Sequence, residues 1–113
     1  DRIVWRLSVP PAEGPAVMAA LTRVSDCTGF YDWGGGLLWL AAAGEGDGGA
    51  SSVRAAISRC GGHATLVRAP AALRVEIPVF QPLPAALAAL TRRVKESFDP
   101  NHLLNPGRIY ADV

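Results

Sequence analysis

The chain has 113 residues, of which 50% are hydrophobic and 19% are charged, and its formal net charge is +1. These values predict a single globular domain over 1–113 and argue against a disordered or membrane-spanning chain, because no apolar run reaches the roughly 18 residues that a membrane span needs. The 11 Lys and Arg residues are spread along the chain apart from a cluster at Arg92, Arg93 and Lys95, so we expect no nucleic-acid partner.

The first part of the chain predicts a strand, a helix and a hairpin. The strand covers 2–9, the helix covers 12–25, and the two strands of the hairpin cover 28–33 and 37–42. Alternating Ile3, Trp5 and Leu7 indicate a strand with one buried face. In the helix, Val17, Leu21 and Val24 recur at helical spacing and predict a buried stripe. Three consecutive glycines, 34–36, provide the hairpin turn, because glycine adopts the positive φ that tight turns require.

A second helix and strand follow a glycine-rich segment. Residues 43–50 contain four glycines and two acids, and we expect a flexible surface loop without an apolar anchor. We expect Ser51 or Ser52 to cap the next helix and Gly61-Gly62 to end it. The expected buried stripe of this helix consists of Val53, Ala56, Ile57 and Cys60. The last strand of the unit covers 63–69.

This order of elements predicts an α+β fold, a ferredoxin-like βαββαβ sandwich over 2–69. In such a fold, an antiparallel sheet of four strands carries both helices on one face. Residues 70–83 contain too many prolines to form one regular helix, so we expect a crossing segment with a short strand at 73–77. A C-terminal amphipathic helix is predicted over 84–98. It should end before Pro100, since the residue preceding a proline is pushed out of the α region. A tail, 99–113, follows.

Few residues of the sandwich carry a recognisable chemical pattern. Cys27 and Cys60 have neither CxxC spacing nor a neighbouring histidine, so we expect free buried thiols and no metal site. His63 opens a predicted edge strand, and no partner lies nearby in the sequence. The tryptophans are better explained by core or interface packing than by base stacking, because the third strand lacks basic residues. An exposed face of Trp and Leu would indicate a docking surface.

The tail is the most specific part of the sequence. Pro106 restricts the backbone and Gly107 frees it, so Asn105 and Arg108 should point in defined directions. Asparagine offers a donor and an acceptor, and arginine offers a planar fork for a carboxylate or phosphate. The alternative is structural, with Asn105 capping the turn and Arg108 in solvent. Both interpretations remain open from the chemistry of these residues alone.

The tail resembles the C-terminal signature of FAD-linked oxidases of the vanillyl-alcohol oxidase type. The matching residues are Phe98-Asp99-Pro100 and Asn105-Pro106-Gly107-Arg108, with supporting stretches at 33–40 and 61–70 that are similar to the glycolate oxidase group of this family. Such tails often carry glycine where this chain has His102. A positive φ at this position would destabilise the tail, although histidine tolerates the left-handed region better than most residues.

The resemblance implies a C-terminal cap or substrate domain whose tail returns toward the flavin. It implies FAD as the cofactor of a parent protein, held by a separate FAD-binding domain that this chain lacks, so the chain is expected to be a C-terminal piece that is inactive alone. The implied reaction is oxidation of a small 2-hydroxy acid, of glycolate or lactate type, to the 2-oxo acid by hydride transfer to the flavin. Asn105 and Arg108 are the implied flavin-side contacts, with His63 as a third candidate; no catalytic residue is assigned.

The resemblance also implies partners and a location. The implied partners are the FAD-binding domain of the same protein, a second flavin subunit and an iron-sulfur subunit, in a cytoplasmic assembly that is peripheral to the inner membrane through its partners. An isolated piece should expose apolar surface and associate with itself. The competing hypothesis is a non-enzymatic ferredoxin-like module for ligand sensing or assembly. It explains the βαββαβ order equally well, but it does not explain the helix and tail after residue 83.

Overall fold

The computed structural model describes residues 2–44 and 46–113, which form two compact units, Asp1–Gln81 and Pro82–Val113. Each unit is described by itself. The elements of the first unit are β1 (Ile3–Ser8), the 3-10 turn η1 (Pro11–Glu13), α1 (Gly14–Val24), β2 (Cys27–Asp32), η2 (Trp33–Gly35), β3 (Leu37–Ala42), α2 (Ala50–Ser58), β4 (His63–Arg68) and α3 (Ala71–Glu76). The second unit consists of α4 (Ala85–Phe98) and a tail without regular secondary structure. The prediction of one domain over 1–113 stays a prediction.

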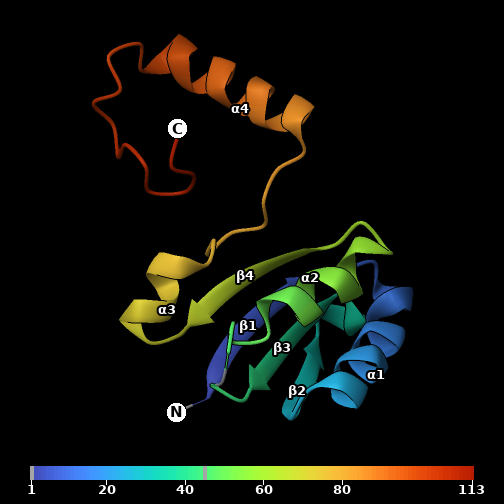
Figure 1. Ribbon diagram of the computed structural model, residues 1–113. Helices are drawn as coiled ribbons and strands as arrows, with labels where there is room; N and C mark the ends of the chain where they lie inside the picture. The colour runs from blue at the N-terminus through green and yellow to red at the C-terminus, as the bar shows by residue number, and fades with distance from the viewer. Residues whose placement is uncertain (1, 45) are drawn as a thin grey trace. The chain divides into compact units, whose positions relative to one another are not determined.

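The first unit is the predicted α+β sandwich. Its four strands form an antiparallel sheet in the order β2-β3-β1-β4. Figure 1 shows α1 and α2 side by side over one face of this sheet. The ferredoxin-like fold class is therefore confirmed.

The core lies between the sheet and the two helices because alternating residues of β1 and β3 face the helices. Ile3, Trp5 and Leu7 are fully buried, and Leu38 and Leu40 of β3 lie beside them. The predicted stripe of α2 is confirmed, since Val53 and Ile57 are buried and Ala56 and Cys60 pack against the core. The stripe of α1 is shorter than predicted: Val17 and Leu21 are buried, but Val24, in the last turn, is exposed.

The glycine-rich segment before α2 is anchored in the core, contrary to the expectation of a surface loop without an anchor. The indole Nε1 of Trp5 donates a hydrogen bond of 2.8 Å to the carbonyl of Gly48. Gly48 has a φ of +62°, and a side chain there would collide with Ile3 and Leu73. A buried indole N–H needs an acceptor, and this loop carbonyl provides it. The loop therefore closes one end of the core.

The expected serine cap of α2 is wrong. The helix begins at Ala50, and the carboxylate of Asp47 accepts hydrogen bonds from the backbone N–H groups of Gly49, at 3.0 Å, and Ser51, at 2.8 Å. The side-chain hydrogen bond from Ser51, and after it the bonds from the N–H groups of Ser51 and Gly49, hold the pKa of Asp47 below its usual value. An acid that precedes the helix thus satisfies an N–H group of its first turn, in which no helical acceptor is available.

The expected short strand at 73–77 is wrong, because this segment is the helix α3, which starts directly after Pro70. Leu73 is buried, Ile77 packs against the core, and Val75 between them is 88% exposed. Positions 73 and 77 share a face in a helix as well as in a strand, so the apolar pattern alone was ambiguous. The exposure of Val75 and the Ile77 N–H bond to the Leu73 carbonyl both indicate the helix, because in a strand position 75 would share the buried face of 73 and 77.

The rest of the predicted crossing segment runs beside β4. The N–H of Leu66 donates to the carbonyl of Val79 at 2.8 Å, and the guanidinium of Arg54 on α2 donates to the carbonyl of Pro78. The same guanidinium lies 5.8 Å from the ring centroid of Trp5. The bond between Leu66 and Val79 covers part of the outer edge of β4, which would otherwise present unpaired backbone groups.

Candidate functional site

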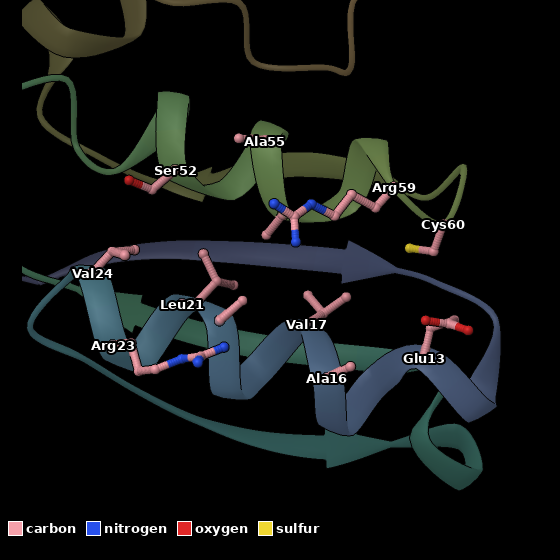
Figure 2. Close-up of a pocket in the computed structure, with 12 residues that line it drawn as sticks. Glu13, Ala16, Val17, Leu21, Arg23, Val24, Ser52, Ala55, Arg59 and Cys60 are labelled. Carbon is pink, nitrogen blue, oxygen red and sulfur yellow. The ribbon is translucent and has the colours of Figure 1, made fainter.

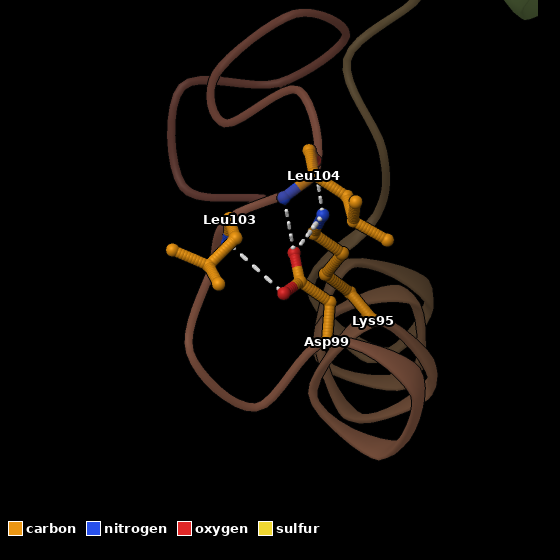
Figure 3. Close-up of polar contacts among 4 residues, drawn as sticks. All are labelled: Lys95, Asp99, Leu103 and Leu104. Atoms are coloured by element: carbon orange, nitrogen blue, oxygen red, sulfur yellow. Dashed lines mark hydrogen bonds and ion pairs between the residues drawn. The ribbon is translucent and has the colours of Figure 1, made fainter.

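The C-terminal helix and tail form the site that the sequence singled out. As predicted, α4 ends at Phe98, and Asp99 leaves the helical region with a φ of −138° and a ψ of 68°. Figure 3 shows how the Asp99 carboxylate then faces the returning tail. Its two oxygens accept from the N–H groups of Leu103, at 2.9 Å, and Leu104, at 2.8 Å. Lys95, one turn earlier, reaches the same carboxylate at 2.6 Å.

Lys95 joins the helix to the tail a second time, because its ammonium group also donates to the carbonyl of Leu104. Asp99 is only 5% exposed, although no residue of α4 itself is buried. Its own loop therefore encloses the carboxylate. The hydrogen bond from Lys95, and then those from Leu104 and Leu103, lower the pKa of Asp99 to about 2. This set of contacts, which we call the Asp99 lock, keeps the carboxylate charged at neutral pH.

The two residues expected at the flavin share one turn of the tail. The N–H of Arg108 donates to the carbonyl of Asn105 at 3.3 Å. Asn105 has a φ of 49° and Gly107 a φ of 69°, so the turn uses the left-handed region on both sides of Pro106. Within the described part of the chain, the side chains of Asn105 and Arg108 make no hydrogen bond or ion pair, and both are exposed.

Further contacts hold the end of the tail. The N–H of Gly107 donates to the carbonyl of Val113 at 2.9 Å, and Arg92 on α4 pairs with Asp112. This pairing lowers the pKa of Asp112. His102 has a φ of 51°, so the position at which related tails often carry glycine does adopt the left-handed conformation. The tail is thus a folded loop whose one arginine presents its fork to solvent.

His63 lies in the first unit, at the start of β4 and opposite Ser8 of β1. Its side chain is exposed on an edge strand, in agreement with the structural interpretation of this residue. The sheet face away from the helices carries the stacked pair Phe30 and Trp39, with ring centroids 6.4 Å apart. Arg6 of β1 is in register with Trp39. An exposed aromatic and cationic surface therefore lies on this face.

The cysteines and tryptophans follow the predictions in part. Cys27 is buried, and burial is the main cause that raises the pKa of its thiol; Cys60 is only half-buried. Trp5 is a core residue, whereas Trp33 is 81% exposed at the hairpin turn. Residues 2–44 and 46–113 include no group of three or more His, Cys, Asp or Glu arranged to hold a metal ion. Across the same residues, no helix is both long and apolar enough to cross a membrane.

Sequence reasoning missed the Asp99 lock. The sequence analysis used Asp99 only as part of the Phe98-Asp99-Pro100 motif, whereas the structure gives its carboxylate the partners Lys95, Leu103 and Leu104. The available signal was Lys95, four residues earlier on the last turn of the helix, together with the proline that turns the chain back. Lysine and aspartate at this spacing are neighbours on a helix surface.

Comparisons with known proteins bear on the same segment. Residues 83–109 match the model of the family "FAD linked oxidases, C-terminal domain". The chain is 31% identical over 112 residues, 97% of its length, to "Glycolate oxidase subunit GlcE" of Escherichia coli (strain K12). It spans 27% of the length of that relative. No solved structure matches the chain. The predicted resemblance to FAD-linked oxidases is confirmed, and FAD is the cofactor that this family implies for the parent protein.

Proposed function

We propose that this chain is the C-terminal domain of an FAD-dependent oxidoreductase subunit, part of an enzyme that oxidises a small 2-hydroxy acid such as glycolate or lactate to the 2-oxo acid. The observation that carries the proposal is the coincidence of the family match at 83–109 with the folded tail. The similarity to a glycolate oxidase subunit over 97% of the chain supports the substrate class. The bound flavin would accept the electrons of the substrate.

In this proposal, the chain helps to bind and orient the flavin. The Arg108 fork and the Asn105 amide are without partners in the described residues, so their donors are available to a phosphate, a carboxylate or a polar edge of the flavin. This donor set fits an anionic cofactor. The Asp99 lock fixes the start of the same tail, which would reduce the entropy lost when the tail binds.

The proposed setting is an assembly. The relative is named as a subunit of glycolate oxidase. We propose that the parent works with its own FAD-binding domain, a second flavin subunit and an iron-sulfur subunit, in the cytoplasm or at the inner membrane through those partners. A ferredoxin-like sensing or assembly module remains the competing function. It predicts a parent protein without flavin.

The test compares the flavin absorbance and the glycolate- and lactate-dependent turnover of the full-length parent with those of variants. Arg108→Ala should lose flavin or turnover several-fold, whereas Arg93→Ala, a matched change on the exposed surface of α4, should lose neither. Asn105→Gly removes the amide while glycine keeps the positive φ without strain. Unchanged flavin content and turnover in both tail variants would remove Asn105 and Arg108 from the site, and a colourless parent would overturn the proposed function.

A further inference from the structure

A groove separates α1 and α2 on the side of the helices that faces away from the sheet core (Figure 2). It has a volume of about 580 Å³ and follows the two helices from Glu13 to Val24 and from Ser52 to Cys60. The 11 residues of α1 make it about 16 Å long. We call this feature the helix groove. All of its lining residues belong to the first unit.

Two arginines extend into the helix groove from opposite ends. Arg23 comes from the last turn of α1 and Arg59 directly follows α2, and Figure 2 shows both side chains directed toward the middle of the groove. Arg23 donates through Nε to the carbonyl of Ala19 at 3.1 Å, and neither arginine pairs with a carboxylate of the described residues. Glu13, the one acid lining the groove, lies at one end.

The walls between the arginines are small and apolar. Ala16, Ala20, Ala55 and Ala56 line the groove above the buried Val17 and Leu21. Alanines allow the backbone of a third element to come close, as in helix packing, where axes lie roughly 8–10 Å apart. A surface with an apolar strip and unpaired cations fits an occupant with an apolar stripe flanked by carboxylates.

We propose that the helix groove receives an acidic amphipathic helix of another subunit of the enzyme. Several arguments favour a protein helix. Small-molecule sites bury most of their ligand, roughly 70–90% of its surface, whereas both arginines and two of the alanines here are exposed. The length suits about three helical turns, the usual arrangement when a helix lies in a groove. We assign the groove to another subunit rather than to a second copy of this chain, because the exposed apolar stripe of α4 is flanked by Arg93, which would face like charges.

This inference rests on the proposed function, since it assigns one surface of the domain to the assembly. The test uses the full-length parent expressed together with its partner subunits, and it measures the dissociation constant of the assembly and the flavin content of the parent. The double variant Arg23→Glu/Arg59→Glu should weaken the assembly more than about tenfold, because it replaces two attractive charge contacts with two repulsive ones. Its flavin content should not change.

Two further variants separate charge from folding. Arg23→Lys/Arg59→Lys keeps both charges and should retain most of the affinity. Ala55→Trp fills the groove from an exposed position without a change of charge, and it should weaken the assembly as the charge reversal does. Thermal unfolding of each parent variant provides the check on folding. The wild-type assembly should also weaken with salt, since exposed charge pairs are screened.

An assembly of unchanged affinity in both the charge reversal and Ala55→Trp would overturn the inference. A yellow wild-type parent that forms no assembly would overturn it as well, while leaving the proposed function intact. A colourless parent that assembles through the groove would overturn the proposed function and support the groove as a docking surface.

Discussion

The two units of the chain are stabilised by different interactions. In the sandwich, large side chains such as Trp5, Ile57 and Leu66 are at most 1% exposed. In the second unit, α4 has no buried residue, and its apolar positions Leu90 and Phe98 are 52% and 84% exposed. The second unit is organised by the Asp99 lock instead. The comparison teaches that apolar burial specifies the sandwich, whereas charge and hydrogen bonding specify the tail, so different perturbations should affect each unit.

The largest expected effect comes from the same substitution made in each unit. Leu66→Ala should lower the free energy of unfolding by about 2–5 kcal/mol, because it leaves a cavity in the core. Leu103→Ala, at a tail position that is 76% exposed, should change it by less than about 0.5 kcal/mol. Denaturant unfolding measures both. Comparable losses at the two positions would mean that Leu103 is buried in solution, and the comparison would fail.

A smaller effect is expected from the hydrogen bond between Trp5 and the loop. Trp5→Phe keeps an aromatic ring but leaves the Gly48 carbonyl without its donor, which should cost about 1–3 kcal/mol. Trp33→Phe, at an indole that is 81% exposed, is the matched control and should be nearly neutral. Urea unfolding compares the two variants. Hydrogen exchange should also accelerate in the segment before α2 in Trp5→Phe only, and protection equal to wild type would show that Gly48 finds another donor.

The tail should respond to acid rather than to loss of apolar volume. The folded-state pKa of Asp99, about 2, lies below the unfolded value of about 3.9. A depressed carboxyl pKa stabilises the folded tail above pH 4, and this contribution is lost as the pH falls from about 4 through about 2. NMR shifts of the Leu103 and Leu104 amides, recorded against pH, should therefore have a midpoint near 2.

The matched variant for this titration is Asp99→Asn, which should abolish the acid transition of the tail amides and speed their hydrogen exchange about tenfold or more. Asp26→Asn, at an exposed ion pair of the first unit, should leave those amides as in wild type. A tail midpoint near 3.9 in the wild-type protein would mean that the Asp99 lock does not form in solution.

The smallest effect on stability should come from the exposed stripe of α4. Val94→Ser/Phe98→Ser removes two exposed apolar side chains, so the unfolding free energy should hardly change, but self-association of this fragment should weaken. Sedimentation velocity at several concentrations measures the association. Val24→Ser/Val75→Ser is the control in the first unit, at two exposed valines on different helices. Equal weakening by both double variants would contradict a specific role for α4.

Much of the fold was predictable because its signals are local. The alternation around Trp5 and the spacing of Leu87, Leu90 and Val94 each repeat with the period of the element that forms, and the glycines of the hairpin mark its turn. The failures share a cause. Leu73 and Ile77 are spaced so that they share a face in a helix and also in a strand. Val24 has the helical spacing of the buried residues Val17 and Leu21, but it is exposed because the core does not extend to the last turn of α1.

The candidate site was only partly predictable. The motif around Pro106 identified the tail and the two residues that present free donors. It did not identify the Asp99 lock, because the spacing places Lys95 near Asp99 but does not show that the N–H groups of Leu103 and Leu104 turn back to the same carboxylate. The helix groove was also missed, because Arg23 and Arg59 lie far apart in the sequence and each has the pattern of an ordinary solvent-exposed residue.

The sequence by itself determined the order of the elements from β1 to β4, the glycine turn of the hairpin and the end of α4, because these depend on neighbours within a few residues. Only the tertiary structure decided which groups meet across long separations. Trp5 and Gly48 are 43 positions apart, and Arg54 reaches Pro78 across 24. Such pairs follow from how the helices pack on the sheet. Packing depends on the shape of the whole core, and no local pattern encodes it.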